Sequence, residues 1–202
     1  MIDRRMPFPY AVGAMAALLL TFLLLMMPRP AWTQAAAETS SGATLAAVSA
    51  FSPRMEGSAA EGALLDWIAA RASREGWHAS PFDFRNSDFG YSFSRCLRVD
   101  VPGRSRDTLI LVVPVDAAPD SAPTRDGSLG VALAVDLLDR LQGARPPLSM
   151  VVLFLGAELG GADPYPMGST LFLRDYQPDY RTAVLYLDLR AMPRRVLVRG
   201  GG

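Results

Sequence analysis

The stretch Met150-Val-Val-Leu-Phe-Leu-Gly-Ala-Glu-Leu-Gly160 decides the fold. Its first six residues are all apolar, which predicts a strand buried on both faces of a sheet. An acidic residue, Glu158, comes directly after this strand. Further strands are predicted at Cys96–Val101, Thr108–Val115 and Ala183–Leu187. Working outward from residue 150, the chain therefore predicts a sheet whose strands carry acidic residues near their ends.

Helical patterns alternate with these strands. Ser58-Ala-Ala-Glu61 has the form of a capping box and begins a helix that ends near Gly76. Apolar spacing predicts a second helix over Gly130–Leu141. Apolar strands alternating with helices indicate an α/β fold, in which helices cover both faces of a mostly parallel sheet in three layers. A last strand is expected at Val196–Val198, directly before Gly202, so we expect the domain to be truncated, or incomplete at its C-terminus.

The N-terminus has the parts of an export leader. Two arginines precede an apolar run over Tyr10–Met27, and prolines and small residues follow it. This is the layout of a secretory signal peptide, but the run is also long enough to span a bilayer. Residues 1–35 are therefore predicted to be a signal peptide or a membrane anchor, and both alternatives stay open. In either case the basic N-terminus stays inside and the rest of the chain is exported, to the periplasmic or extracellular face.

Composition predicts a linker and excludes several kinds of functional site. Residues 36–50 are rich in small and polar residues and predict a flexible linker, which leaves 51–202 for the α/β domain. The 20 basic residues are all arginine, balance 20 acidic residues and are scattered, which excludes a nucleic-acid site. The single cysteine, Cys96, excludes an internal disulfide and a cysteine-based zinc site, and we expect it to be an inert core residue. The single histidine, His78, limits metal chemistry and is expected in a surface turn.

Four carboxylates lie at or near the predicted strand ends: Asp116, Asp126, Glu158 and Asp188. In an open parallel sheet, ligands bind beyond the carboxyl ends of the strands. Carboxylates gathered there raise one another's pKa unless a metal ion, an arginine or solvent relieves the repulsion. Spacing alone leaves another possibility open, in which Asp116 and Asp126 are ordinary loop or cap residues and Glu158 is solvated.

Short motifs in a fixed order add a family resemblance. They are Arg54-Met-Glu-Gly-Ser58, Val101-Pro-Gly103, Val113-Pro-Val-Asp116, Asp126-Gly-Ser-Leu-Gly-Val131, Gly156-Ala-Glu-Leu-Gly160 with Gly168-Ser169, and Tyr186-Leu-Asp188. With them, the chain from Arg54 onward resembles the N-terminal two-thirds of the co-catalytic di-zinc aminopeptidase family. That family includes secreted bacterial aminopeptidases, glutamate carboxypeptidase, glutaminyl cyclase and the ectodomain of the transferrin receptor.

The resemblance implies a role for each carboxylate. Asp126 would bridge two zinc ions, Glu158 would bind one of them and Asp188 the other. Asp116 would orient a metal-bound histidine through a hydrogen bond.

Several positions depart from the family pattern. Pro114 stands where the first histidine ligand belongs, and Ala157 stands where the catalytic glutamate belongs. Gly127 replaces the asparagine that follows the bridging aspartate, and the second histidine would lie beyond Gly202. By the resemblance, no catalytic residue is intact, and only remnant metal ligands are left.

The physical consequence of these departures is a metal site with too few ligands. Each zinc ion would keep two carboxylate ligands, one of them shared, whereas catalytic zinc usually has three protein ligands that include imidazole. An all-oxygen remnant better suits Mg²⁺ or Ca²⁺, weakly. Loss of the general base costs about 10²–10⁴-fold in rate. We therefore predict an inactive member of the family, a pseudoenzyme or a fragment, with zinc unbound or weakly bound and a peptide or protein as its ligand.

Two alternatives remain at this point. The chain could be a working metallo-aminopeptidase with a divergent site, completed by another chain or by residues absent from this sequence. It could also be an unrelated α/β envelope protein with chance motif matches, in which case Asp126, Glu158 and Asp188 would not converge.

Overall fold

The computed structural model describes residues 41–85, 93–117, 127–158, 168–170, 172, 176 and 180–189. The chain divides into two compact units, Met1–Thr39 and Ser40–Gly202, and all described residues belong to the second. The predicted leader, Asp126 and the predicted strand over Val196–Val198 lie outside the described residues. Within those residues, no helix is long and apolar enough to cross a membrane.

Residues 41–49 form a helix, so the prediction of a flexible linker over 36–50 is wrong for this part. Alanine-rich sequence favours a helix when one face can be buried. Here Thr44 and Val48 are buried one turn apart, and Leu45 packs beside them against the core. The composition suggested flexibility because the few apolar positions in this segment are spaced among small residues.

Helix α3 spans Ala59–Arg74, and its start follows the predicted cap. The Ser58 hydroxyl accepts a hydrogen bond from the Glu61 backbone N–H at 3.2 Å. The Glu61 carboxylate reaches back to the backbone N–H of Gly57, at 2.8 Å, rather than to that of Ser58. The helix ends just before Gly76, whose φ of +86° suits glycine. The predicted helix is confirmed, and it buries Leu64, Leu65 and Ile68 on one face.

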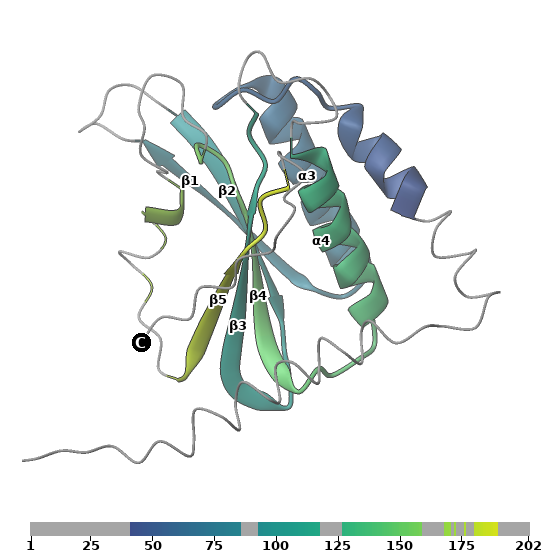
Figure 1. Cartoon of the computed structure of the whole chain (residues 1–202), viewed down its shortest axis with the longest axis vertical. Coiled ribbons are helices and arrows are strands. Elements are labelled where there is room, and N and C mark those ends of the chain that lie inside the picture. The colour runs from purple at the N-terminus through teal and green to yellow at the C-terminus, as the bar shows by residue number, and fades with distance from the viewer. Residues whose placement is uncertain are drawn as a thin grey trace, which may run out of the picture. The chain divides into compact units, whose positions relative to one another are not determined.

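Helix α4 spans Ser128–Leu141 and begins after Gly127, which has a φ of +80°. It packs beside α3 on the same face of the sheet (Figure 1). Arg71 of α3 joins the two helices by donating to both carboxylate oxygens of Asp139, from Nε at 3.1 Å and from Nη2 at 2.6 Å.

Among the described residues, five strands form one sheet in the order β1-β2-β4-β3-β5. Their bounds are His78–Arg85 for β1, Phe93–Val101 for β2, Ser105–Pro114 for β3, Leu148–Leu155 for β4 and Thr182–Tyr186 for β5. Strand β3 is parallel to both β4 and β5, whereas β2 is antiparallel to both β1 and β4. Of the five, β2 alone therefore runs in the opposite direction, and the predicted mostly parallel α/β sheet is confirmed.

Strand β1 was not predicted, and the surface turn expected around His78 is wrong because that residue begins β1. The stretch from His78 to Arg85 contains Pro81, which argues against a central strand. At the edge of a sheet a proline is tolerated, and β1 is the edge strand next to β2.

The connection between β2 and β3 is short, yet the two strands are not neighbours. Residues 102–104 join them, and β4 lies between them in the sheet. The joining turn lies against the start of β4, where the Arg104 N–H donates to Pro146 O at 2.9 Å. A Cβ at Gly103 would collide with the backbone of Leu148, so this approach requires glycine.

Side chains of each central strand alternate between two apolar clusters. One face packs against α3, α4 and the helix over residues 41–49, with Val152 and Phe154 of β4 at its centre. The other face contains Cys96, Leu153 and Leu155, with Phe172 and Tyr176 packed on it. This double burial explains the continuous apolar run of β4. Burial raises the pKa of the Cys96 thiol, in keeping with an inert core residue.

Candidate functional site

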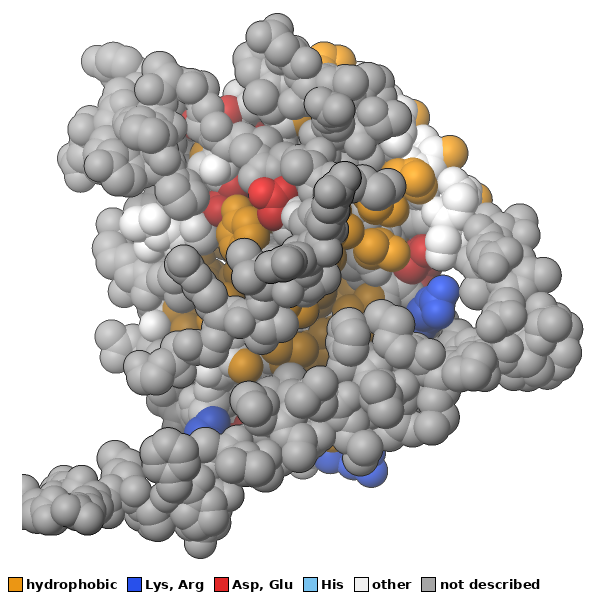
Figure 2. Space-filling model, in the orientation of Figure 1, with side chains coloured by type: hydrophobic (Ala, Val, Ile, Leu, Met, Phe, Trp, Pro, Cys, Tyr) orange, Lys and Arg blue, Asp and Glu red, His pale blue; other side chains and the backbone are white. Residues whose placement is uncertain are grey.

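The carboxyl ends of β3, β4 and β5 lie at one edge of the sheet. Pro114, at the end of β3, pairs with Leu155, at the end of β4, and Cys96, near the start of β2, pairs with the same residue. The beginning of α3 contacts the start of β2 through the Ser94–Glu61 hydrogen bond. Figure 2 shows acidic side chains gathered beside apolar ones in the upper part of the view. We call this region the carboxyl edge.

Glu158 follows β4 and is buried, with 7% of its surface exposed. The backbone N–H of Ser169 donates to its Oε1, and the Tyr186 hydroxyl donates to its Oε2 at 2.8 Å. Burial raises the pKa of this carboxyl, hydrogen bonds from Ser169 and Tyr186 oppose the rise, and the charge of Asp116 adds to it. Both oxygens of Glu158 are thus engaged within the protein.

Asp116 follows β3 and is almost fully buried. Its charge raises the pKa of Glu158 and that of Glu61, so the three carboxyls lie within electrostatic reach of one another. The structure therefore brings together two of the four carboxylates singled out in the sequence, Asp116 and Glu158.

Asp188 follows β5 and is half-buried. The Leu187 N–H donates to Val112 O at 2.8 Å, which extends the β3–β5 pairing to the residue before Asp188. Leu187 O also lies close to Gly130, in the first turn of α4, where a Cβ would be 3.2 Å from it. The fourth carboxylate, Asp126, lies outside the described residues.

Pro114 and Ala157 occupy the positions where the resemblance expects a histidine ligand and a general base. Pro114 is buried at the end of β3 and has no side-chain ligand atom. Ala157 is fully buried and has a φ of +54°. This left-handed conformation costs a residue with a Cβ about 1–2 kcal/mol. The backbone here is strained, yet the side chain is a methyl group without acid or base function.

The sequence identified Glu61 only as a helix cap, but it belongs to the carboxyl edge. It is fully buried and accepts from the Gly57 N–H and from the Ser94 hydroxyl, the latter at 3.0 Å. Burial raises its pKa to about 7, and Asp116 adds to the rise. The signal that could have found it is its place three residues after the helix cap, since helix N-termini often lie at the carboxyl ends of strands.

Arg54 brings a positive charge to the same edge and is fully buried. Its Nε donates to Val115 O at 2.8 Å, and its Nη1 donates to the Ser128 hydroxyl at 3.2 Å. The guanidinium thus joins the end of β3 to the start of α4. In the sequence this residue is visible only as the first position of a motif.

These groups do not fit a catalytic zinc centre. In the part of the chain that the structure describes, no group of three or more histidine, cysteine or acidic side chains could hold a metal ion. Glu158 accepts hydrogen bonds at both oxygens, and Pro114 and Ala157 contribute neither ligand nor base. His78 is on β1 at the opposite end of the sheet, with a side chain that is 77% exposed.

Comparison with known proteins gives a clear result for the fold. No family model and no curated protein matches the sequence. Solved structures do match. A glutaminyl cyclase of Porphyromonas gingivalis has 20% sequence identity and a TM-score of 0.64, and the matched region covers 76% of this chain and 59% of the cyclase chain. A leucine aminopeptidase precursor of Bacteroides thetaiotaomicron has 15% identity and a TM-score of 0.62, with coverages of 76% and 62%. The chain has the fold of the zinc exopeptidases.

A Zn-dependent exopeptidase of Parabacteroides distasonis agrees, at 18% identity and a TM-score of 0.59, with coverages of 76% and 61%. This chain spans about 60% of the length of these zinc-exopeptidase-fold structures. The resemblance inferred from the motifs is confirmed at the level of the fold, and the alternative of an unrelated α/β fold is contradicted.

Proposed function

We propose that this chain is an exported domain of the zinc-exopeptidase fold that binds a peptide or protein and does not hydrolyse peptides as it stands. The observation that carries the proposal is the state of Glu158. Its two oxygens accept hydrogen bonds from Tyr186 and from Ser169, and the residue before it is Ala157. A carboxylate engaged in this way supports the fold rather than a metal ion.

The energetic argument follows from these contacts. To bind a metal ion, Glu158 would have to give up at least one hydrogen bond to a charged oxygen, each of which contributes about 1.5–3 kcal/mol. The remaining ligands would have to offset this loss, and Pro114 offers none. Without a metal-bound water near neutral pKa and without a base, peptide hydrolysis has neither nucleophile nor proton acceptor.

Export and partner class rest on the sequence. The apolar run over Tyr10–Met27, with arginines before it, supports export with the leader cleaved or retained as an anchor. The balanced and scattered charge supports a peptide or protein ligand rather than a nucleic acid. Robust hydrolysis by the chain would contradict the inactive assignment and favour a metal site completed from outside it.

The deciding experiment measures both the metal content and the enzymatic activity of the chain. The purified whole chain would be equilibrated with zinc, dialysed and analysed by mass spectrometry for metal. It would also be assayed for hydrolysis of aminoacyl anilides and for cyclisation of peptides with N-terminal glutamine, because proteins with both activities share this fold. We expect no retained zinc and no activity.

The matched control is Glu158→Ala. About one or two retained zinc ions, with a chelator-sensitive activity that Glu158→Ala abolishes, would overturn the proposal.

The proposed peptide binding is tested by selecting a random peptide library on the folded chain, with the denatured chain as control. Failure to enrich any peptide on the folded chain over the denatured one would count against a peptide ligand.

A further inference from the structure

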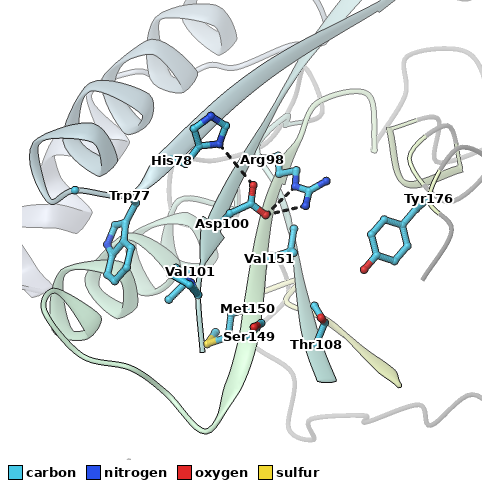
Figure 3. A pocket seen from close by; sticks show the side chains of 12 residues that line it. Trp77, His78, Arg98, Asp100, Val101, Thr108, Ser149, Met150, Val151 and Tyr176 are labelled. Carbon is cyan, nitrogen blue, oxygen red and sulfur yellow. Dashed lines mark hydrogen bonds and ion pairs between the residues drawn. The ribbon is translucent and has the colours of Figure 1, made fainter. Parts of the chain in front are cut away.

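A second polar site lies at the end of the sheet opposite the carboxyl edge. There, side chains near the starts of β1, β3 and β4 and the end of β2 line a cavity of about 450 Å³ (Figure 3). Val151 and Tyr176 belong to one face of the sheet, with the polar groups of Arg98 and Asp100 beside them, whereas Trp77 and Met150 pack on the helix-covered face and line the margin of the cavity. The volume is in the range of small-molecule sites in proteins.

Arg98 is held in place for recognition. Its Nε and Nη2 donate to a single oxygen, Asp100 Oδ1, at 2.9 Å and 2.8 Å. Its third nitrogen, Nη1, makes no hydrogen bond with the residues that the structure describes. In Figure 3 the guanidinium lies beside Asp100, and Tyr176 stands apart from it on another side of the pocket. One edge of the guanidinium is thus fixed, and a donor remains for a ligand without further ordering of the side chain.

Tyr176 provides a second donor. Its ring stacks on Phe172 with centroids 5.0 Å apart, which orients the phenol. Its hydroxyl has no hydrogen-bond partner among the described residues. Two donors at the rim of an apolar cavity match a ligand that has an anionic group on an apolar body.

The charge balance selects among anions. Asp100 neutralises the charge of Arg98, so the site has no excess positive charge for a multiply charged phosphate. A carboxylate has a single charge and two oxygens, which matches two donors.

The His78 ring does not add catalysis here. Ser80 Oγ, at 3.2 Å, and Asp100 Oδ2, at 3.7 Å, both lie at the same ring nitrogen, Nδ1. A histidine that activates a serine needs these two groups on opposite nitrogens. The arrangement therefore indicates binding alone.

We propose that this cavity binds a small organic carboxylate, which accepts hydrogen bonds from Arg98 Nη1 and from the Tyr176 hydroxyl and lays its apolar part on Val151, on the same face of the sheet. The proposal is independent of the carboxyl edge and of any metal there.

The test uses the whole chain in mild detergent, with acetate, benzoate and hippurate as carboxylate probes. Hippuramide is the uncharged counterpart of hippurate, and inorganic phosphate is the competing anion. Binding is followed by calorimetry and by the fluorescence of Trp77, which lines the cavity. We expect hippurate to bind at least about tenfold more tightly than hippuramide, because a charge-assisted hydrogen bond is lost with the amide.

Variants then locate the site. Arg98→Met is expected to weaken hippurate binding about tenfold, and Arg98→Lys less. Arg181→Met is the matched control, since Arg181 is 75% exposed and does not line the cavity. Circular dichroism checks that each variant folds. If Arg98→Met does not fold, Arg98→Lys carries the test.

Several results would overturn the proposal. They are equal binding of hippurate and hippuramide, phosphate binding tighter than hippurate, absence of binding by all three carboxylates, or unchanged hippurate affinity in the folded Arg98 variants.

Discussion

The two ends of the sheet contain the same kinds of side chain and use them differently. At the carboxyl edge, Arg54 and Glu61 are fully buried and bond to the backbone and to neighbouring side chains. At the opposite end, the side chains of Arg98 and Asp100 are 38% and 34% exposed, and both residues line a cavity. Burial thus decides whether a charged group stabilises the fold or remains available to a ligand. At the carboxyl edge these charged groups stabilise the fold, whereas at the opposite end they line a cavity.

Replacing the buried arginine should give the largest effect. Arg54→Met keeps most of the side-chain volume but leaves Val115 O and the Ser128 hydroxyl without their donor. We expect a loss of about 3–5 kcal/mol in the free energy of unfolding, measured by urea denaturation. A loss below about 1 kcal/mol would mean that the carboxyl edge does not depend on its internal cation.

Gly156→Ala should be the next most damaging change. A Cβ at this position would collide with Glu61 Oε1 and Ser94 Oγ, and would lie 2.7 Å from Arg95 O. We expect a loss of about 3 kcal/mol, because close-packed groups must shift. The control is Gly42→Ala, where nothing lies within 4 Å and the residue is helical. That change should be neutral or stabilising, and equal effects at both glycines would contradict the packing described here.

The Glu61→Gln variant tests the electrostatics of the carboxyl edge. Burial raises the pKa of Glu61 from 4.5 to about 7, so the native state keeps a proton that the unfolded chain releases in this window. The contribution of Glu61 to stability is therefore fully present below pH 4.5 and is lost as the pH rises through about 7. It amounts to about 3 kcal/mol.

Glutamine stays neutral, so the variant should gain stability relative to the wild type between about pH 5 and about pH 8. Urea denaturation across this range measures the difference. Asp66→Asn is the control on the same helix, because the Asp66 side chain is 70% exposed, and it should keep the wild-type profile. Parallel profiles for wild type and Glu61→Gln would show that the carboxyl is not desolvated as described.

Arg98→Met should have the smallest effect on stability, within about 0.5 kcal/mol, because its ion pair with Asp100 is partly exposed and lies within one strand. Urea denaturation measured beside Arg54→Met gives the contrast directly. A loss in the free energy of unfolding as large as that of Arg54→Met would contradict the difference between the two ends of the sheet.

Much of the fold was accessible from the sequence because burial leaves a strong pattern. The apolar runs predicted β2, β3, β4 and β5 to within a few residues, and the Ser58 cap predicted the start of α3. Strand β1 was missed because an edge strand alternates weakly and contains Pro81. The helix over residues 41–49 was missed because its burial depends on a surface that other segments provide.

The candidate site was less accessible, because it depends on contacts between distant segments. Glu158 and Asp116 could be placed at strand ends from the apolar runs that precede them. The hydrogen bond from Tyr186 to Glu158 joins residues 28 positions apart, and that from Ser94 to Glu61 joins residues 33 positions apart. No local pattern records such pairs. The Arg98 cavity was likewise invisible, because its polar residues occupy alternate positions of strands and look like solvated faces.

The place of β4 between β2 and β3 has a consequence for how the chain folds. Strands β2 and β3 follow each other closely in sequence, but neither can complete its pairing until residues 148–155 arrive between them. A nascent chain that ends before β4 therefore has two apolar strands next to an empty central position. Such non-local pairing slows folding and prolongs the exposure of strand edges that can aggregate. Strand β4, at the centre of the sheet, is thus synthesised after both of its neighbours, β2 and β3. Folding of the domain has to wait for it.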